Sequence, residues 1–194
     1  MNIVVLATDQ NVGRSIVTYQ KNTDKIIKLT SHSAMACSGS NSNLTNFTEL
    51  IAKNIALYEL SNDGVKLSPH AQANFARNEL AKGLRKGPFQ VNVLLGGYDT
   101  QTKESALYTL DYMGTLHKVD HGCQGYSSYF CSATMDRECK VGEELDEEKA
   151  VSIIEKCIHA LQTRFMPNHS NFIIKVVDKD GVRVIRFDSD PAIN

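Results

Sequence analysis

The first part of the chain alternates short apolar runs with polar turns, a pattern typical of strands. Residues 2–8 contain a continuous run from Ile3 to Ala7, which is too short for a helix and is rich in β-branched residues. Lys25–Leu29 and Ser33–Cys37 are two further runs, and a turn at Ser38-Gly39-Ser40 follows them. The pattern therefore predicts one strand buried on both faces, followed by a hairpin.

Two helical patterns come next. From Leu44 onward, apolar residues fall at intervals of three and four, which places them on one face of a helix that ends near Gly64. A second helix is predicted to begin at Ser68-Pro69, where a hydroxyl cap precedes proline at the first helical position, and to end at Gly87-Pro88. The predicted inner faces are Leu44, Phe47, Ile51, Ile55 and Tyr58 in the first helix, and Ala73, Ala76, Leu80 and Leu84 in the second.

A second group of strands lies in the middle of the chain. Phe89–Tyr98 alternates apolar and polar residues, and its Gly96-Gly97 pair predicts a bulge or the end of the strand. Ala106–Tyr112 is the predicted partner strand, followed by a short strand at Leu116–Val119. The pattern of residues 122–136 is ambiguous but favours a helix.

The last part of the chain predicts one long helix and a hairpin. The helix begins near Asp146, where Glu147 and Glu148 complement the helix dipole, and ends at 166–168. Phe172–Val177 and Val182–Phe187 flank the turn Asp178-Lys179-Asp180-Gly181, and residues 188–194 are expected to form a loose tail. The predicted buried face of the helix is Ala150, Ile154, Cys157, Ile158, Leu161 and Phe165.

The order of elements is strands, two helices, strands, two helices, strands. This order predicts an α+β fold in which two packed sheets are covered by a helical pair on each outer side, a four-layer αββα sandwich. No repeat, linker or low-complexity tract interrupts it, so residues 1–194 are predicted to form a single domain.

The composition narrows the class of protein. The chain has 194 residues, of which 42% are hydrophobic and 22% charged, and its formal net charge is −1. It is therefore expected to fold, without the basic surface that nucleic acid or an anionic membrane requires and without a membrane span or secretory signal. An odd number of cysteines with no C-x-x-C pair favours a reducing compartment over a disulfide framework or a zinc site: Cys37, Cys123, Cys131, Cys139 and Cys157.

The candidate chemistry is sparse. No two of the six histidines lie four residues apart on a predicted helix, so we expect no metal pair. His121 and Cys123 could hold an imidazole and a thiol, although a structural role for the cysteine is the better explanation. Gly96-Gly97 is too short for a phosphate-binding loop, and the residues after Asp178–Gly181 do not continue the ligand pattern of a calcium loop. The acidic run Glu143–Glu148 is interpreted as the solvated start of a helix.

Several short blocks, in order and at consistent separations, carry a resemblance that covers nearly the whole chain. They are Leu67-Ser68-Pro69, Pro88–Asp99, Leu107-Tyr108 with Asp111–Gly114, His121-Gly122 with Gly125-Tyr126, and Lys175–Gly181. With them the chain resembles the beta subunits of the 20S proteasome. The resemblance implies the αββα fold of the amino-terminal nucleophile hydrolases, which agrees with the layers predicted from the pattern.

The resemblance also implies which positions of this sequence correspond to the catalytic residues of active family members. Active family members use an amino-terminal threonine whose own amine is the base, supported by an aspartate and a lysine and by a later serine and aspartate. This sequence begins Met1-Asn2, and most of the family's first strand is expected to be missing. Thr8 falls at the aspartate position with Asp9 one place on, and Lys25 falls at the lysine position; Tyr126 stands near the serine, and Phe165 replaces the aspartate after Arg164.

On this resemblance, no catalytic, cofactor-binding or metal-binding residue is expected. The chain is predicted to be a non-catalytic beta subunit that contributes to ring assembly, and thereby to ATP- and ubiquitin-dependent protein degradation by the complex. The implied partners are other beta subunits and alpha-ring subunits in a hetero-oligomer of about 28 chains, with regulatory particles contacted indirectly, in the cytoplasm and nucleus. The alternatives are a self-contained hydrolase, of the amino-terminal nucleophile type or based on Cys123, and a stand-alone peptide-binding module.

Overall fold

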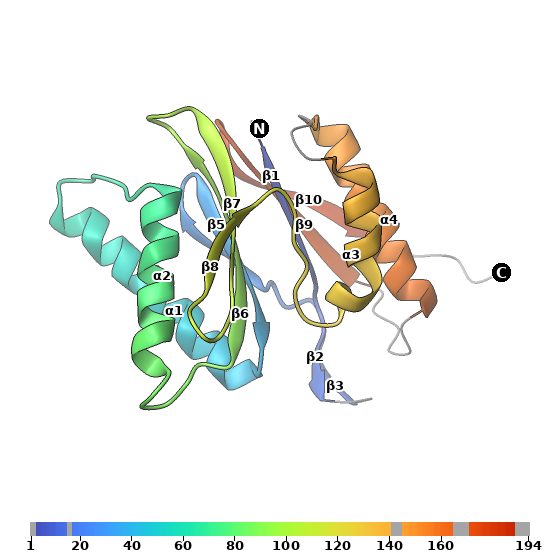
Figure 1. Ribbon diagram of the computed structural model, residues 1–194, viewed down its shortest axis with the longest axis horizontal. Helices are drawn as coiled ribbons and strands as arrows, with labels where there is room; N and C mark the ends of the chain where they lie inside the picture. Colours follow the sequence, from blue (N-terminus) through green and yellow to red (C-terminus); the bar gives the residue numbers. More distant parts are fainter. Residues whose placement is uncertain (1–2, 15–16, 141–144, 165–170, 189–194) are drawn as a thin grey trace.

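The computed structural model describes residues 3–14, 17–140, 145–164 and 171–188. It contains four layers: a helical pair, a five-stranded sheet, a three-stranded sheet and a second helical pair (Figure 1). The predicted αββα sandwich is therefore confirmed. Within the described ranges, no helix is long and apolar enough to cross a membrane.

The five-stranded sheet is antiparallel throughout, with its strands in sequence order. The predicted hairpin of the first two strands is confirmed, with Ile27 paired to Met35. The strands are β4 (Ile26–Thr30), β5 (Ser33–Gly39), β6 (Val91–Asp99), β7 (Glu104–Leu110) and β8 (Leu116–Val119).

Gly96 and Gly97 lie inside β6, so the predicted bulge or strand end was wrong. The strand continues to Asp99 in regular register with both neighbouring strands. A side chain at Gly96 would place its Cβ 2.6 Å from Val4 Cγ1, and one at Gly97 would place it 2.6 Å from Pro69 Cγ. The two glycines therefore allow close packing on both faces, toward the second sheet and toward a helix start.

The second sheet contains β1 (Val4–Asp9), β9 (Asn171–Asp178) and β10 (Gly181–Asp188), with β9 in the centre and β1 at one edge. The predicted strand in residues 2–8 and the hairpin around Asp178–Gly181 are both confirmed. The sequence pattern missed a small hairpin of β2 (Val12–Arg14) and β3 (Val17–Gln20). The two strands are only three and four residues long, and all of β3 is exposed, so the hairpin adds no run of buried residues to the sequence pattern.

The first helical pair consists of α1 (Asn41–Ser61) and α2 (Pro69–Gly83), which pack on the five-stranded sheet. The predicted start of α2 is confirmed, because Ser68 Oγ accepts a hydrogen bond from Ala71 N at 3.2 Å. Two residues expected on the inner faces are instead exposed, Tyr58 at 40% and Leu84 at 38%. The predicted end of α2 at Gly87-Pro88 was wrong, because the helix ends at Gly83 and Leu84 is its C-cap.

The second pair consists of α3 (Ser127–Glu138) and α4 (Glu147–Arg164), which pack against each other, with α4 also against β1 (Figure 1). The ambiguous segment 122–136 thus divides into a loop and a helix. Cys157 and Ile158 are buried on α4 as predicted, whereas Ala150, Ile154 and Leu161 are partly buried. Phe165, the predicted helix end at 166–168 and residues 189–194 of the predicted tail lie outside the described residues.

Candidate functional site

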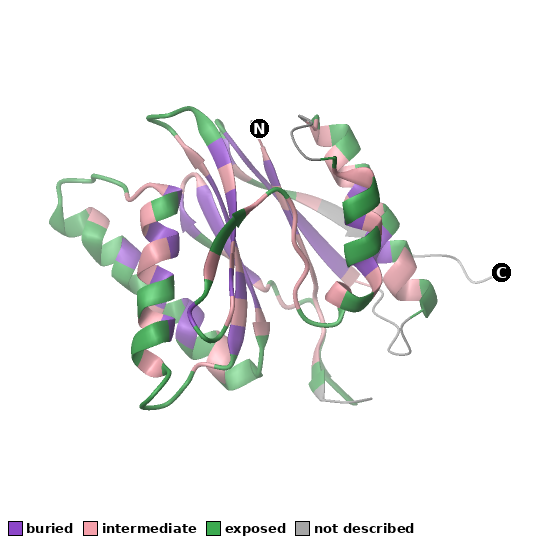
Figure 2. Ribbon diagram, viewed as in Figure 1, coloured by how far each residue is buried: buried purple, intermediate pink, exposed green. Residues whose placement is uncertain are grey.

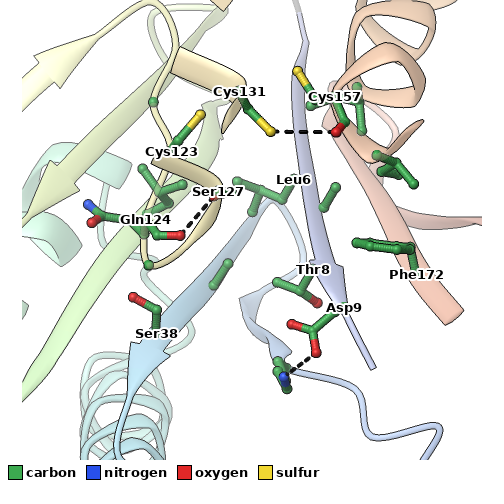
Figure 3. Close-up of a pocket in the computed structure, with 18 of the residues that line it drawn as sticks. Leu6, Thr8, Asp9, Ser38, Cys123, Gln124, Ser127, Cys131, Cys157 and Phe172 are labelled. Atoms are coloured by element: carbon green, nitrogen blue, oxygen red, sulfur yellow. Dashed lines mark hydrogen bonds and ion pairs between the residues drawn. The ribbon is translucent and has the colours of Figure 1, made fainter. Parts of the chain in front are cut away.

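A cavity of about 1170 Å³ lies between β1, the ends of β5 and β6, and the α3–α4 pair. It collects most of the residues singled out by the sequence, with Thr8 and Asp9 on one wall and Cys123, Gln124 and Ser127 on the opposite wall (Figure 3). These residues come from segments more than a hundred positions apart. The cavity therefore brings together the residues at the family's catalytic positions and the cysteine of the alternative hydrolase hypothesis.

Asp9 and Lys25 form an ion pair at the end of β1. Lys25 Nζ lies 2.8 Å from Asp9 Oδ2 and donates a second hydrogen bond, of 2.6 Å, to the main-chain oxygen of Asn11. Asn11 N donates to the same carboxylate oxygen at 3.1 Å. The two side chains are 30% and 18% exposed, so the pair is partly screened from water. The lysine thus holds the turn after β1 in place.

Thr8 does not take part in this pair. The resemblance had placed Thr8 at the family's aspartate position, but the structure brings its neighbour Asp9 to Lys25. Thr8 sits within β1 opposite Ile173, and its buried Oγ1 has no hydrogen-bond partner among the described residues. Its hydroxyl is therefore not hydrogen-bonded to Lys25.

His121 and Cys123 lie close in sequence but interact with different groups. His121 Nε2 is 2.8 Å from Asp136 Oδ1, and Cys123 Sγ donates to Met135 Sδ at 3.4 Å. Burial raises the pKa of the Cys123 thiol to about 11. A thiol that stays protonated at neutral pH is a poor nucleophile. The second ring nitrogen of His121, Nδ1, has no hydrogen-bond partner in the described part of the chain, so it does not bond to the Cys123 thiol.

Residues 1–177 match the family model for the proteasome subunit. The chain belongs to the proteasome subunit family. It is 44% identical to proteasome subunit beta type-2-A of Arabidopsis thaliana over 179 residues, which cover 92% of this chain and 86% of that protein. Proteasome subunit beta type-2 of Oryza sativa subsp. japonica is 43% identical over 182 residues, covering 94% and 84% of the two chains. Proteasome subunit beta type-4 of Saccharomyces cerevisiae is 35% identical over 183 residues, covering 94% and 91%.

Proteasome family membership confirms the resemblance found in the sequence blocks and the fold it implied. The similarity is to beta-type subunits, so this chain is a beta-type proteasome subunit that belongs in a multi-subunit complex. The charged pair that the resemblance identified, Asp9 with Lys25, is present. Tyr126, which stands near the family's serine position, lies just before α3 and is 67% exposed. Phe165, at the family's later aspartate position, lies outside the described residues.

Seen as a proteasome subunit, the chain carries apolar side chains on two opposite outer layers. Leu57 and Leu60 of α1, with Val65 just after it, are 60%, 82% and 58% exposed. Tyr129 on α3 is 82% exposed and lies on the other side of the sandwich, whose outward faces Figure 2 shows as largely exposed. Large exposed apolar side chains gathered in one region mark surfaces for other proteins.

The sequence did not predict that the cysteines gather together. Cys123, Cys131, Cys139 and Cys157, here called the thiol cluster, share one core region between α3 and α4, whereas Cys37 lies apart on β5. All five are free. Within the described residues, no group of three His, Cys, Asp or Glu side chains is arranged to hold a metal ion. The signal in the sequence that indicated part of this cluster was the position of Cys131 and Cys157 on apolar faces.

Proposed function

We propose that this chain is a non-catalytic beta-ring subunit of a 20S proteasome core particle. Its role is to build the beta ring together with other beta subunits and with alpha-ring subunits, and so to serve protein degradation by the complex, including the ATP- and ubiquitin-dependent route. We place it in the cytoplasm and nucleus, where thiols stay reduced. Similarity to beta type-2 and beta type-4 proteasome subunits over more than nine-tenths of the chain supports the ring position.

The observation that carries the non-catalytic proposal is the Thr8 hydroxyl, which lies next to the Asp9–Lys25 pair in sequence but does not bond to it. A hydroxyl nucleophile needs a base within hydrogen-bond reach to take its proton. Lys25 is held by Asp9 Oδ2 and by the Asn11 carbonyl, and the adjacent hydroxyl of Thr8 has no hydrogen-bond partner among the described residues. The nitrogen of Thr8 is a peptide amide within β1 and cannot act as the base. Thr8 therefore does not provide a hydroxyl nucleophile whose own amine acts as the base, and this supports a structural role.

Cys123 hydrolysis is the competing function from the enzyme class. The thiol would have to be ionised, yet burial raises its pKa to about 11 and its hydrogen bond goes to a methionine sulfur. The nearby imidazole bonds Asp136 through Nε2. An activated cysteine instead has a lowered pKa and a base oriented toward it. The geometry therefore favours a packing role for Cys123.

The placement of the exposed apolar side chains supports assembly. A ring made of different subunits uses heterologous contacts, so each subunit needs two different surfaces that face its two neighbours. Leu57 and Tyr58 of α1 border a groove of about 330 Å³ toward α2, and Leu60 is exposed on the same helix. Tyr126 and Tyr129 lie at the start of α3 in the opposite layer. One surface on each outer layer is the arrangement that a ring position requires.

The test separates catalysis from assembly. Cells that carry Lys25→Met as the sole copy of the gene should yield assembled particles in which every peptidase activity, measured per particle, equals that of the parent. Lys28→Met is the matched control, because Lys28 is an exposed lysine on the same segment. Loss of one peptidase activity from Lys25→Met particles of normal subunit composition would overturn the non-catalytic proposal. Cys123→Ala measured in the same way tests the rival.

A further inference from the structure

Two thiols of the thiol cluster, Cys131 and Cys157, meet between α3 and α4. Both are buried, at 1% and 4% exposure, and they belong to the same core region as Met135 and Ile153. Cys131 Sγ lies 3.5 Å from the main-chain oxygen of Cys157, so the α3 side chain reaches the backbone of the facing residue on α4. Figure 3 shows Cys131 pointing from α3 toward Cys157.

The two thiols also interact with each other. The Cys131 S–H donates to the main-chain oxygen of Cys157, and the interaction between the two side chains lowers the pKa of the Cys157 thiol and raises that of Cys131. Cys157 is therefore the sulfur that ionises more readily, and Cys131 is the protonated thiol that faces it from α3. A thiolate with a second thiol beside it is the usual arrangement of an oxidation-sensitive pair.

Small molecules have a route to this pair. Cys131 and Cys157 both line the large cavity, and Cys123 and Cys139 line it as well. The cavity is large enough for a peroxide to reach sulfur atoms that are hidden from bulk solvent. Among the sulfur atoms present, Cys123 Sγ is directed to Met135 Sδ at 3.4 Å, so it is not oriented toward Cys157 in the way that Cys131 is.

We propose that Cys131 and Cys157 form an oxidisable dithiol that a peroxide converts to a disulfide linking α3 to α4. The Cys157 thiolate attacks the peroxide oxygen, the O–O bond breaks, and a sulfenic acid forms at Cys157 as hydroxide or alkoxide leaves. The Cys131 sulfur then attacks the sulfenic sulfur, the S–S bond forms, and water leaves. Two thiols and one peroxide thus give one disulfide, one water and one alcohol or second water. A thiol reductant restores both thiols.

The test maps disulfides in the full-length chain after exposure to hydrogen peroxide. Trypsin cleaves after Lys156 and releases Cys157 on its own peptide, but it leaves Cys123 and Cys131 together on residues 119–137. Chymotrypsin, which cleaves after Phe130, separates those two cysteines. The expected result is a Cys131–Cys157 link that is absent before oxidation and lost after treatment with dithiothreitol.

Single substitutions provide the controls. Cys123→Ser and Cys37→Ser should retain the link, whereas Cys131→Ser and Cys157→Ser should lose it. Measurement on the unsubstituted chain decides the outcome even if a variant fails to fold. A predominant link through Cys123 or Cys139 would overturn the proposal, as would oxidation of Cys157 beyond the sulfenic acid without any link. Recovery of Cys131 and Cys157 as free thiols after peroxide exposure would also overturn it.

Discussion

The two helical layers cover their sheets in different ways. Under α1 and α2 the core is closed, and Phe47, Ile51 and Leu80 are at most 1% exposed. Between α3 and α4 the buried core consists of two thiols, a methionine and Ile153, and it borders the cavity of about 1170 Å³. The first layer thus provides stability through close packing, whereas the second encloses space and contains the thiols.

The largest expected effect tests this difference with the same substitution in both layers. Ile51 on α1 and Ile153 on α4 are both buried, but only Ile153 lines the cavity. Ile51→Ala creates a sealed hole and should lower the free energy of unfolding by about 4 kcal/mol, whereas Ile153→Ala enlarges an existing cavity and should cost about 2 kcal/mol. Urea unfolding followed by circular dichroism measures both, and equal costs would contradict the comparison.

A second prediction concerns the boundary between the two halves of the sandwich. A Cβ at Gly96 would lie 2.6 Å from Val4 Cγ1, across the interface of the two sheets. Gly96→Ala should therefore destabilise the chain by about 1–3 kcal/mol through overpacking. Gly87 is the matched control, since a Cβ there meets nothing within 4 Å, and Gly87→Ala should leave stability unchanged or slightly higher. An unchanged free energy of unfolding in Gly96→Ala would contradict this prediction and would show that the two sheets can move apart at little cost.

The smallest effect concerns the outer surface of the α3–α4 layer. Arg183 Nη1 donates to Glu147 Oε1 at 2.8 Å and ties the start of α4 to β10, which holds the pKa of Glu147 below its ordinary value of 4.5. A lowered folded-state pKa adds stability above pH 4.5 that is lost as the pH falls through the folded value. Because the pair is solvent-exposed, the contribution should be about 0.5 kcal/mol.

Glu147→Gln measures that contribution. Its urea midpoint should fall below that of the parent near pH 6, and the gap should close in more acidic buffer. Glu148→Gln, which changes an exposed neighbour in the same helical turn, is the control and should show no such pH-dependent gap. A gap that widens as the pH falls would mean that the sign of the linkage is wrong.

Local chemistry made much of the fold predictable. The Ser68-Pro69 start of α2 and the turn at Asp178–Gly181 follow from capping and turn preferences that act within a few residues. The layers follow from periodicity combined with element order. The same local signals failed at Gly96-Gly97, because the reason for those glycines is a pair of close approaches by distant segments, Val4 and Pro69.

The candidate site was predictable only where the resemblance supplied positions. Asp9 and Lys25 were named in advance, and their 2.8 Å contact confirms the pairing. The clustering of the cysteines could not be predicted from the sequence, because Cys131 and Cys157 come together through the packing of α3 on α4. The β2–β3 hairpin was not predicted because its strands are only three and four residues long and β3 is exposed throughout.

The most direct test of the central claim is native mass spectrometry of the protein recovered from its own cells through a tag placed after Asn194. A ring-building subunit is expected to be found in one large complex with several different alpha and beta proteasome subunits, and the isolated chain is expected to self-associate through its exposed apolar surfaces. Recovery only as a monomer or a small homo-oligomer, from cells whose other beta subunits are assembled, would contradict it.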